Sequence, residues 1–214
     1  ISDKYGWQKT ADGWRGGFLP LQIRGLLRGI CDKDGLLYKS GVVSGPTSAG
    51  KTLLGELRML ARFYNTDEKP NKTVMLVPSK EIGLEKVKGL QQAYGHKNKE
   101  NGLRICYSDG ERRSLDEDIR DGEFDVVVMT NEKLKYFMQN EKFLTGVGEI
   151  VIDELGTMTD KSRGPFLEMA SAAALKAHKD MTILALGRPF SGIEKLLDTF
   201  DPAEENRFYV EDAD

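Results

Sequence analysis

The stretch Gly41-Val-Val-Ser-Gly-Pro-Thr-Ser-Ala-Gly-Lys-Thr-Leu-Leu54 decides the fold of this chain. Val42 and Val43 form a short apolar run that predicts a buried strand, and a helical pattern with leucines on one face begins at Leu53. Residues 45–52 between them fit G-x-x-x-x-G-K-[ST] at every fixed position. We therefore predict a phosphate-binding loop, and it consists of Gly45, Pro46, Thr47, Ser48, Ala49, Gly50, Lys51 and Thr52.

The chemistry of this loop follows from its backbone and from two side chains. Its N–H groups can converge on an anion, and the N-terminus of the following helix adds partial positive charge. Lys51 would reach the β- and γ-phosphates of a nucleotide, and Thr52 would offer its hydroxyl to Mg²⁺. The alternative interpretation is a Gly/Ser-rich turn that carries a surface lysine.

Composition limits the possible partners of the chain. Its 214 residues suffice for one large α/β domain, and its apolar fraction of 39% with regular apolar runs indicates a globular chain. The net charge of −3 means that nucleic-acid binding would need a local patch or backbone amides. No stretch approaches the ~20 apolar residues of a membrane span. We expect an intracellular location, nuclear if the source is eukaryotic and otherwise cytoplasmic.

Short apolar runs alternate with helical patterns along most of the chain. This alternation is typical of an α/β fold with a mostly parallel sheet and helices on both faces. We expect one domain over residues 18–200, an arm or loop before it at 1–17, and an acidic tail or linker after it at 201–214. Polar clusters follow the predicted strands, at the edge where such sheets bind ligands. These clusters are 45–52, 78–80, 108–110, 130–133, 153–156 and 187–189.

The run Ile150-Val-Ile-Asp-Glu154 supplies a second half for the nucleotide site. Asp153 at the end of an apolar strand can hold Mg²⁺ beside Thr52, and Glu154 can orient or deprotonate the attacking water. Two surface acids at a strand end are the alternative. The residues 153–156 also fit the D-x-x-G switch of GTPases, but no N-K-x-D follows, which argues against a guanine site.

Over roughly residues 18–200 the chain resembles the first RecA-like domain of superfamily 2 helicases. The similarity is to the branch that holds the helicase half of DNA polymerase theta and related archaeal repair helicases. Residues 46–53 resemble motif I of that branch, and Val151-Ile-Asp-Glu-Leu155 resembles motif II. The segments 77–80, 108–110, 130–133 and 163–168 resemble further motifs, and Phe18-Leu-Pro-Leu-Gln22 resembles the adenine-reading element.

The resemblance implies a single RecA-like P-loop domain that uses ATP and Mg²⁺. Lys51, Asp153 and Glu154 would act in catalysis, with Thr52 and Asp153 at the metal, and Gln22 would read the adenine edge. Single-stranded nucleic acid, DNA in preference to RNA, would lie on Pro78, Ser79, Lys80, Gly110, Thr130, Glu132 and Lys133. The alternative for Gln22 is an ordinary polar residue at the start of a helix. The alternative for each predicted strand-binding residue is an ordinary helix cap or a solvated charge.

The sequence departs from the family pattern in two places that would couple ATP to the strand. Gly156 replaces the usual histidine of motif II, and Gly187-Arg188-Pro189 replace the usual Ser-Ala-Thr of motif III. The family also implies a second RecA-like domain with an arginine finger, so this chain alone should hydrolyse ATP slowly. We expect the motor domain of an ATP-dependent helicase. The alternatives are a degenerate, nucleotide-dependent scaffold or an RNA helicase of the same superfamily.

Overall fold

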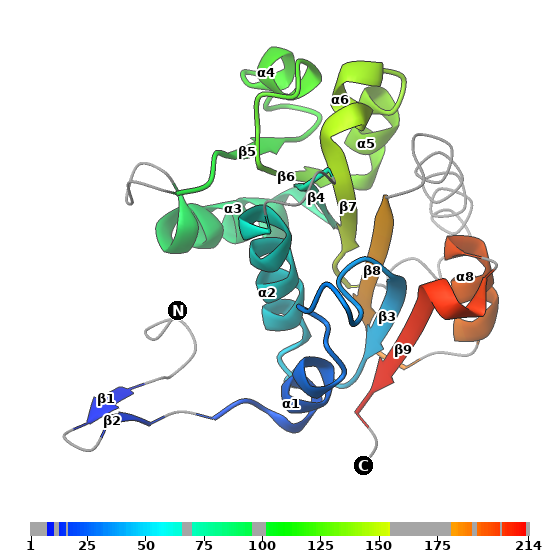
Figure 1. Ribbon diagram of the computed structural model, residues 1–214. Coiled ribbons are helices and arrows are strands. Elements are labelled where there is room, and N and C mark those ends of the chain that lie inside the picture. Colours follow the sequence, from blue (N-terminus) through cyan, green and yellow to red (C-terminus); the bar gives the residue numbers. More distant parts are fainter. Residues whose placement is uncertain are drawn as a thin grey trace.

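The computed structural model describes residues 8–10, 13–15, 17–65, 70–95, 102–154, 181–189, 192–201 and 203–212. Their centre is a sheet whose strands are β3 (Ser40–Ser44), β4 (Lys72–Val77), β5 (Ile105–Ser108), β6 (Val126–Thr130), β7 (Val147–Ile152), β8 (Thr182–Gly187) and β9 (Arg207–Glu211). The helices around it are α1 (Pro20–Leu27), α2 (Lys51–Tyr64), α3 (Lys80–Tyr94), α4 (Asp116–Arg120), α5 (Asn131–Phe137), α6 (Glu141–Gly146) and α8 (Ile193–Phe200) (Figure 1).

The strand order is β5-β6-β4-β7-β8-β3-β9, and every pair of neighbours is parallel. Because all strands run the same way, their carboxyl ends meet at one edge of the sheet. The α/β class and the parallel sheet predicted from the sequence are therefore confirmed. The order also divides the edge, with β7, β8 and β3 on one side and β4, β6 and β5 on the other.

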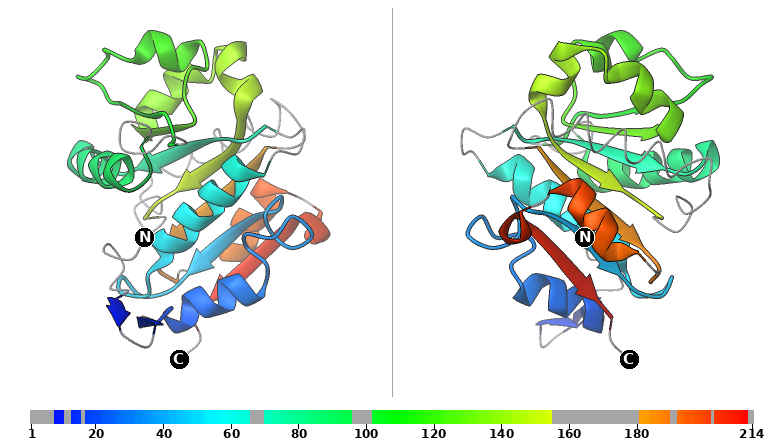
Figure 2. Two further views of the ribbon diagram at one scale, coloured as in Figure 1. Left: turned by 60° about the vertical axis from the view of Figure 1, so that its left-hand side comes forward. Right: turned by 90° about the vertical axis from the view of Figure 1, so that its right-hand side faces the viewer.

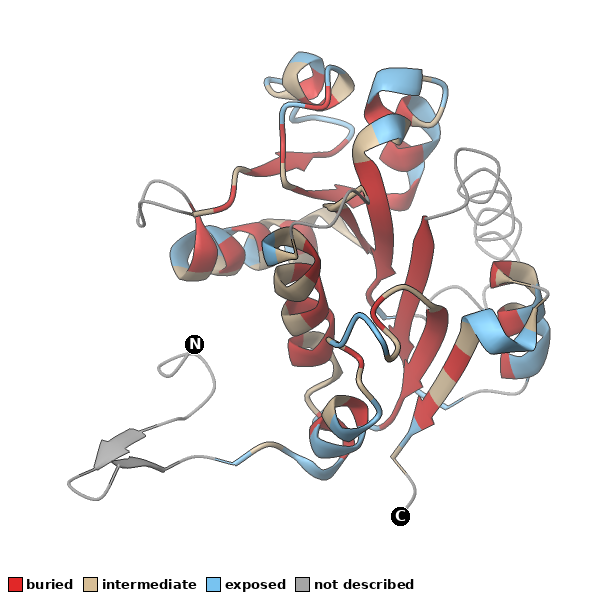
Figure 3. Cartoon of the chain, in the orientation of Figure 1, coloured by how far each residue is buried: buried red, intermediate tan, exposed pale blue. Residues whose placement is uncertain are grey.

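Successive side chains of each strand point to opposite faces of the sheet, so the core is divided into two apolar clusters, one on each face. Val43 contributes to one apolar cluster with Leu54 of α2 and Leu90 of α3. Its neighbour Val42 contributes to the other cluster, with Phe137 of α5 and Phe200 of α8. Figure 2 shows α2 in front of the sheet in one view and α8 in front in the other. The strands are buried almost throughout and exposure concentrates on the outer helix faces (Figure 3).

The carboxyl-terminal segment corrects the predicted domain boundary. Residues 201–214 were expected to form a tail or linker, but Arg207–Glu211 form β9 and pair with β3 from Ser40↔Arg207 to Ser44↔Glu211. The domain therefore continues to at least Glu211. Arg24 of α1 and Arg28, which directly follows that helix, donate to the outer side of this edge strand, to the Glu211 and Tyr209 carbonyls respectively. These contacts cover backbone acceptors that an edge strand would otherwise leave open.

The amino-terminal segment contains a small hairpin within the region expected to be an arm or loop. Strands β1 (Gln8–Thr10) and β2 (Gly13–Arg15) pair antiparallel, with Gln8 opposite Arg15. Gly156 and the segment 163–168, which resembles a further motif, lie outside the described residues. Among the helices that are described, none is long and apolar enough to cross a membrane.

A buried ionic network lies at the amino ends of β7 and β8. Arg58 and Arg62 of α2 are fully or almost fully buried with Glu149 of β7, and Arg58 Nε lies 2.5 Å from Glu149 Oε1. Both guanidinium groups donate to the hydroxyl of Thr182, the first residue of β8. They also donate to backbone carbonyls of Leu36, Leu37 and Lys39 in the segment before β3. Leu57 and Leu60 of the same helix are only half-buried, and these arginines occupy the deeper positions.

We predict that Glu149→Gln lowers the free energy of unfolding by about 3–5 kcal/mol, because it leaves two buried guanidinium groups without their carboxylate. Urea denaturation with an unchanged m-value would measure this loss. Glu141→Gln, which removes an exposed acid at the start of α6, is the matched control and should have little effect. Equal stability of the two variants would contradict a stabilising role for the network.

Candidate nucleotide site and strand-binding edge

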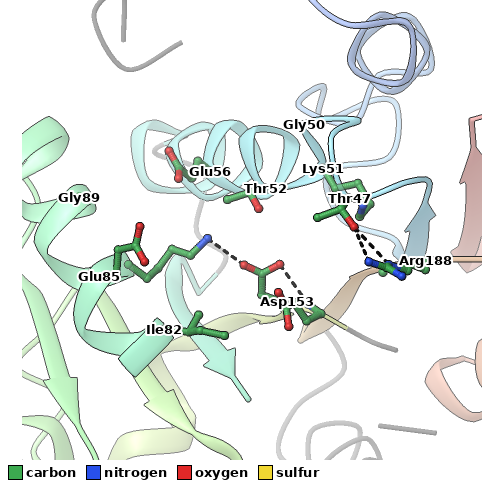
Figure 4. Close-up of a pocket in the computed structure, with 13 residues that line it drawn as sticks. Thr47, Gly50, Lys51, Thr52, Glu56, Ile82, Glu85, Gly89, Asp153 and Arg188 are labelled. Carbon is green, nitrogen blue, oxygen red and sulfur yellow. Dashed lines mark hydrogen bonds and ion pairs between the residues drawn. The ribbon is translucent and has the colours of Figure 1, made fainter. Parts of the chain in front are cut away.

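Three chain segments meet at the carboxyl edge on the β7-β8-β3 side. The loop 45–50 follows β3, Asp153 and Glu154 follow β7, and Arg188 follows β8. They line one pocket of about 770 Å³ together with residues of α2 and α3 (Figure 4). Its lining residues are Thr47, Gly50, Lys51, Thr52, Glu56, Ile82, Glu85, Lys86, Gly89, Asp153, Glu154, Gly187 and Arg188. The two predicted halves of the nucleotide site therefore come together in one cavity.

The backbone at Gly50 fixes the start of α2. Its φ of 70° is in the left-handed region, and a Cβ there would lie 2.0 Å from Gln22 Nε2. Gln22 is buried, donates to the Gly50 carbonyl at 3.0 Å and accepts from the Leu19 N–H at 2.9 Å. Gln22 thus ties the start of α1 to the loop. Its predicted contact with an adenine edge stays a prediction.

Lys51 is the first residue of α2, and its side chain forms hydrogen bonds with the backbone of the loop. Its ammonium donates to the Gly45 carbonyl at 2.8 Å and to the Pro46 carbonyl at 2.6 Å. Desolvation is the largest cause of a lowered pKa for Lys51, and the nearby Arg188 acts in the same direction while Asp153 opposes it. An entering phosphate would replace these two carbonyls as the acceptor of the Lys51 ammonium.

Both acids of the 153–154 pair line the pocket, although they are adjacent in the chain. Asp153 is buried, and its Oδ1 accepts from the Glu154 N–H at 3.1 Å. Glu154 is exposed and has a φ of 58°, which is uncommon for a residue other than glycine. The backbone leaves the strand here, and that turn lets consecutive side chains share a cavity. Asp153 and Thr52, the two residues predicted to hold Mg²⁺, both line this pocket and both carry oxygen atoms, which Mg²⁺ prefers as ligands.

Lys86 is a residue of this site that sequence analysis missed. It lies on α3, and its ammonium is 2.8 Å from Asp153 Oδ2, with both side chains largely buried. The ammonium thus contacts the carboxylate that is predicted to hold a metal ion. Helical spacing gave a weak signal, since Ile82, Lys86 and Gly89 share one face of α3, but only the packing of α3 beside α2 directs that face at Asp153.

The predicted strand-binding residues gather along the other side of the edge, after β4, β5 and β6. Ser79 caps α3 by accepting from the Ile82 N–H at 3.4 Å, and Lys80 pairs with Glu111 at 2.5 Å. Pro78 is half-buried beside them, and Gly110 is exposed with open space around it. Gly110 thus has no neighbour where a side chain would lie, and its carbonyl accepts from Arg113 Nε at 3.2 Å.

Asp109 organises the loop that carries Gly110. Its buried carboxylate accepts from the N–H groups of Glu111 at 2.7 Å and Arg112 at 2.8 Å, from the Tyr107 hydroxyl and from the Arg112 guanidinium. Burial alone would raise the pKa of Asp109, but these donors outweigh it and lower the pKa to about 2. The same Tyr107 hydroxyl also contacts the Lys80 carbonyl, so this loop and the start of α3 form one unit.

The predicted strand-binding residues at the end of β6 and the start of α5 differ in their exposure. Glu132 is exposed, whereas Thr130 and Lys133 are buried. The Lys133 ammonium lies 2.5 Å from Asp116 Oδ2, and the other oxygen of Asp116 accepts from the Ser108 hydroxyl at 2.6 Å. Lys133 therefore already has a buried counter-ion and joins α5 to α4. Its predicted contact with a nucleic-acid phosphate would require that pair to open.

The residues that replace motif III begin at Gly187, the last residue of β8, and lie directly beside the loop. Gly187 is buried and accepts from the Gly45 N–H at 3.0 Å, while Arg188 and Pro189 are exposed. The Arg188 guanidinium donates to the Thr47 hydroxyl at 2.8 and 3.2 Å. The segment usually occupied by hydroxyl side chains thus brings a positive charge to the pocket.

A parallel sheet with a phosphate-binding loop after β3 and paired acids after a neighbouring strand defines a RecA-like P-loop nucleotide-binding domain. Residues 31–186 match the family described as DEAD/DEAH box helicase. The chain belongs to the DEAD/DEAH box helicase family, which confirms the resemblance found in the sequence. This family uses a nucleotide.

Curated relatives include proteins named ATP-dependent DNA helicase Hel308. The chain is 32% identical over 161 residues to that of Thermoplasma acidophilum, covering 75% of this chain and 22% of the relative. It is 30% identical over 185 residues to that of Methanocella arvoryzae, covering 86% of this chain and 24% of the relative. The chain thus spans less than a quarter of the length of these relatives.

Solved structures share the fold at low sequence identity. DEAD-box helicase Mss116, bound to ssRNA and UDP-BeF, has a TM-score of 0.73 and 16% identity, covering 92% of this chain and 41% of that one. Helicase Lhr of Mycobacterium smegmatis, bound to ssDNA and AMP-PNP, has a TM-score of 0.72 and 16% identity, covering 92% and 26%.

We predict that Lys86→Met lowers the free energy of unfolding, measured without Mg²⁺, by about 1–3 kcal/mol. The reason is that Asp153 then lacks its charged hydrogen-bond donor. Added Mg²⁺ should raise the Tm of this variant more than that of the unmodified chain, since no ammonium competes for Asp153. Lys88→Met, an exposed lysine of the same helix, is the control. An identical Mg²⁺ response in all three proteins would show that Lys86 and the metal do not compete.

A second prediction follows from the lowered pKa of Asp109. A carboxylate whose pKa is lower in the folded than in the unfolded chain stabilises the fold above about pH 4, and this contribution is lost as the pH falls toward 2. The stability difference between the unmodified chain and Asp109→Asn should therefore narrow between pH 6 and pH 2.5. Denaturation curves at the two pH values measure it, and a constant difference would contradict the prediction.

Proposed function

We propose that this chain is the ATP-binding motor domain of a helicase that moves along and unwinds nucleic acid, with DNA as the preferred strand. The observation that carries the proposal is the single pocket that joins Lys51 and Thr52 to Asp153 and Glu154. The adjoining edge after β4, β5 and β6 offers a surface for a strand. The proposal is limited to a domain because the chain spans only part of its relatives.

Each residue of the pocket has a defined role in this proposal. The amides of the loop and the Lys51 ammonium bind phosphate oxygens, and the Thr52 hydroxyl and Asp153 hold Mg²⁺. The metal ion, when bound, neutralises charge that develops on the phosphates. Glu154 would orient the attacking water and accept its proton, because this exposed acid lines the same cavity. Gln22, whose side-chain amide donates to the Gly50 carbonyl, is proposed to hydrogen-bond the adenine edge.

The strand is proposed to lie across Pro78, Ser79, Lys80, Gly110, Thr130 and Glu132. Backbone groups and hydroxyls at this edge suit phosphate contacts that do not depend on base identity. The names of the Hel308 relatives support DNA as the strand. A second RecA-like domain, proposed to belong to the same full-length protein, would close over the nucleotide and supply an arginine finger worth about 10³–10⁵ in rate.

We predict that Lys51→Ala in the intact protein lowers nucleic-acid-stimulated ATP hydrolysis by at least about 100-fold, because the terminal phosphates lose a preorganised cation. A phosphate-release assay with saturating single-stranded DNA measures it. Lys195→Ala, which removes an exposed lysine of α8, should leave the rate unchanged. Retained hydrolysis in Lys51→Ala would refute the proposed site.

A degenerate scaffold that binds nucleotide and strand without unwinding is the second candidate. The observation that favours it is the replacement of motif III by Gly187-Arg188-Pro189, with Arg188 bonded to the loop at Thr47. A strand-displacement assay on DNA and RNA duplexes separates the candidates. ATP turnover without displacement on either duplex would favour the scaffold, and displacement of RNA alone would favour an RNA helicase.

A further inference from the structure

Strand register places residue 188 beside the phosphate-binding loop. β3 and β8 are parallel neighbours with Ser44 opposite Gly187, and the Gly45 N–H donates to the Gly187 carbonyl at 3.0 Å. β8 also lies between β7 and β3. The residue that follows β8 therefore stands between the loop and the acids at the end of β7. A nucleotide's terminal phosphate would occupy this interval, because Lys51 borders it on one side and Asp153 on the other.

The Arg188 side chain is held toward this interval. Its Nε and Nη2 donate to Thr47 Oγ1 at 3.2 and 2.8 Å, and the residue lines the pocket with Lys51 and Thr52 (Figure 4). Arg188 also contributes to the lowered pKa of Lys51, after desolvation, because two positive charges face the same space. The Thr47 hydroxyl uses two of the five N–H donors of the guanidinium and leaves the rest for another acceptor.

The three cations that line the pocket differ in whether a carboxylate pairs with them. Lys86 has Asp153 as its counter-ion. Lys51 bonds to carbonyls and Arg188 to a hydroxyl, and no carboxylate of the described residues forms an ion pair with either. Asp153 and Glu154 line the same pocket and oppose the lowering of the pKa of Lys51, but neither forms a direct ion pair with it, so the two cations keep donors that an anion can use. The planar guanidinium fork matches phosphate oxygens, which can accept two parallel hydrogen bonds.

We propose that Arg188 is a phosphate-binding residue that β8 supplies to the terminal phosphate of the bound nucleoside triphosphate. The inference rests on the proposed function and assigns to it a residue that distinguishes a triphosphate from a diphosphate. The loop amides and Lys51 bind the inner phosphates in either nucleotide. Arg188 follows β8, between the loop after β3 and the acids after β7. In this position it would contact only the phosphate that ADP lacks.

Equilibrium binding of a non-hydrolysable ATP analogue and of ADP, each with Mg²⁺, tests this assignment on the whole chain. Arg188→Ala should weaken binding of the analogue by about 10-fold or more, the effect of losing a hydrogen bond to a charged group, and should change ADP binding by less than about 2-fold. Arg188→Lys should retain part of the preference, because it keeps the charge and loses the fork.

Lys195→Ala is the matched control for loss of an exposed cation far from the pocket, and it should bind both nucleotides normally. Thermal unfolding of Arg188→Ala should match the unmodified chain, because the side chain is exposed. An equal loss of affinity for the analogue and for ADP would overturn the inference and assign Arg188 to support of the loop. Unchanged binding of both would overturn it too. If the unmodified chain binds neither nucleotide, the proposed function itself fails.

Discussion

The parallel pairing of all strands in the central sheet is the constraint on which the remaining structure depends. It sends every carboxyl end to one edge, so turns that are distant in the sequence become neighbours there. The loop after β3, the acids after β7 and Arg188 after β8 share a cavity for this reason. The strand order then separates this nucleotide side from the proposed strand-binding side after β4, β6 and β5. Nucleotide and strand would thus bind to adjacent parts of one rigid edge.

Helix α2 connects the two ends of this architecture. Its first residue is Lys51 in the phosphate-binding loop, and its second half carries Arg58 and Arg62 into the buried network with Glu149. A helix of this length spans about 20 Å, so the loop is fixed at one edge by an anchor near the other. The ionic network holds the helix in one register against β7 and β8, because each guanidinium has several specific acceptors. Unpaired charge in that position would be costly.

The nucleotide pocket is organised by the balance of its charges. Lys86 neutralises Asp153, and Lys51 is satisfied by loop carbonyls. Bound nucleotide and metal would replace both arrangements, since phosphates suit the cations and Mg²⁺ suits the carboxylate. Arg188 adds a charge where the family pattern has small hydroxyl side chains, so the pocket differs from that pattern in its electrostatics while the loop itself is complete. If Arg188 has the proposed role, the departure affects the part of the site nearest the terminal phosphate.

The sequence by itself determined the phosphate-binding loop, the acids at 153–154, the α/β class and the family. These features depend on neighbouring residues and on short periodicities, which local sequence records directly. The tertiary structure decided that α3 directs Lys86 at Asp153, that Lys133 is buried against Asp116, and that Arg207–Glu211 join the sheet as β9. It also placed Arg188 against Thr47, 141 residues away in the chain. Such contacts depend on strand order and helix packing, and no local pattern encodes which distant partner a side chain will meet.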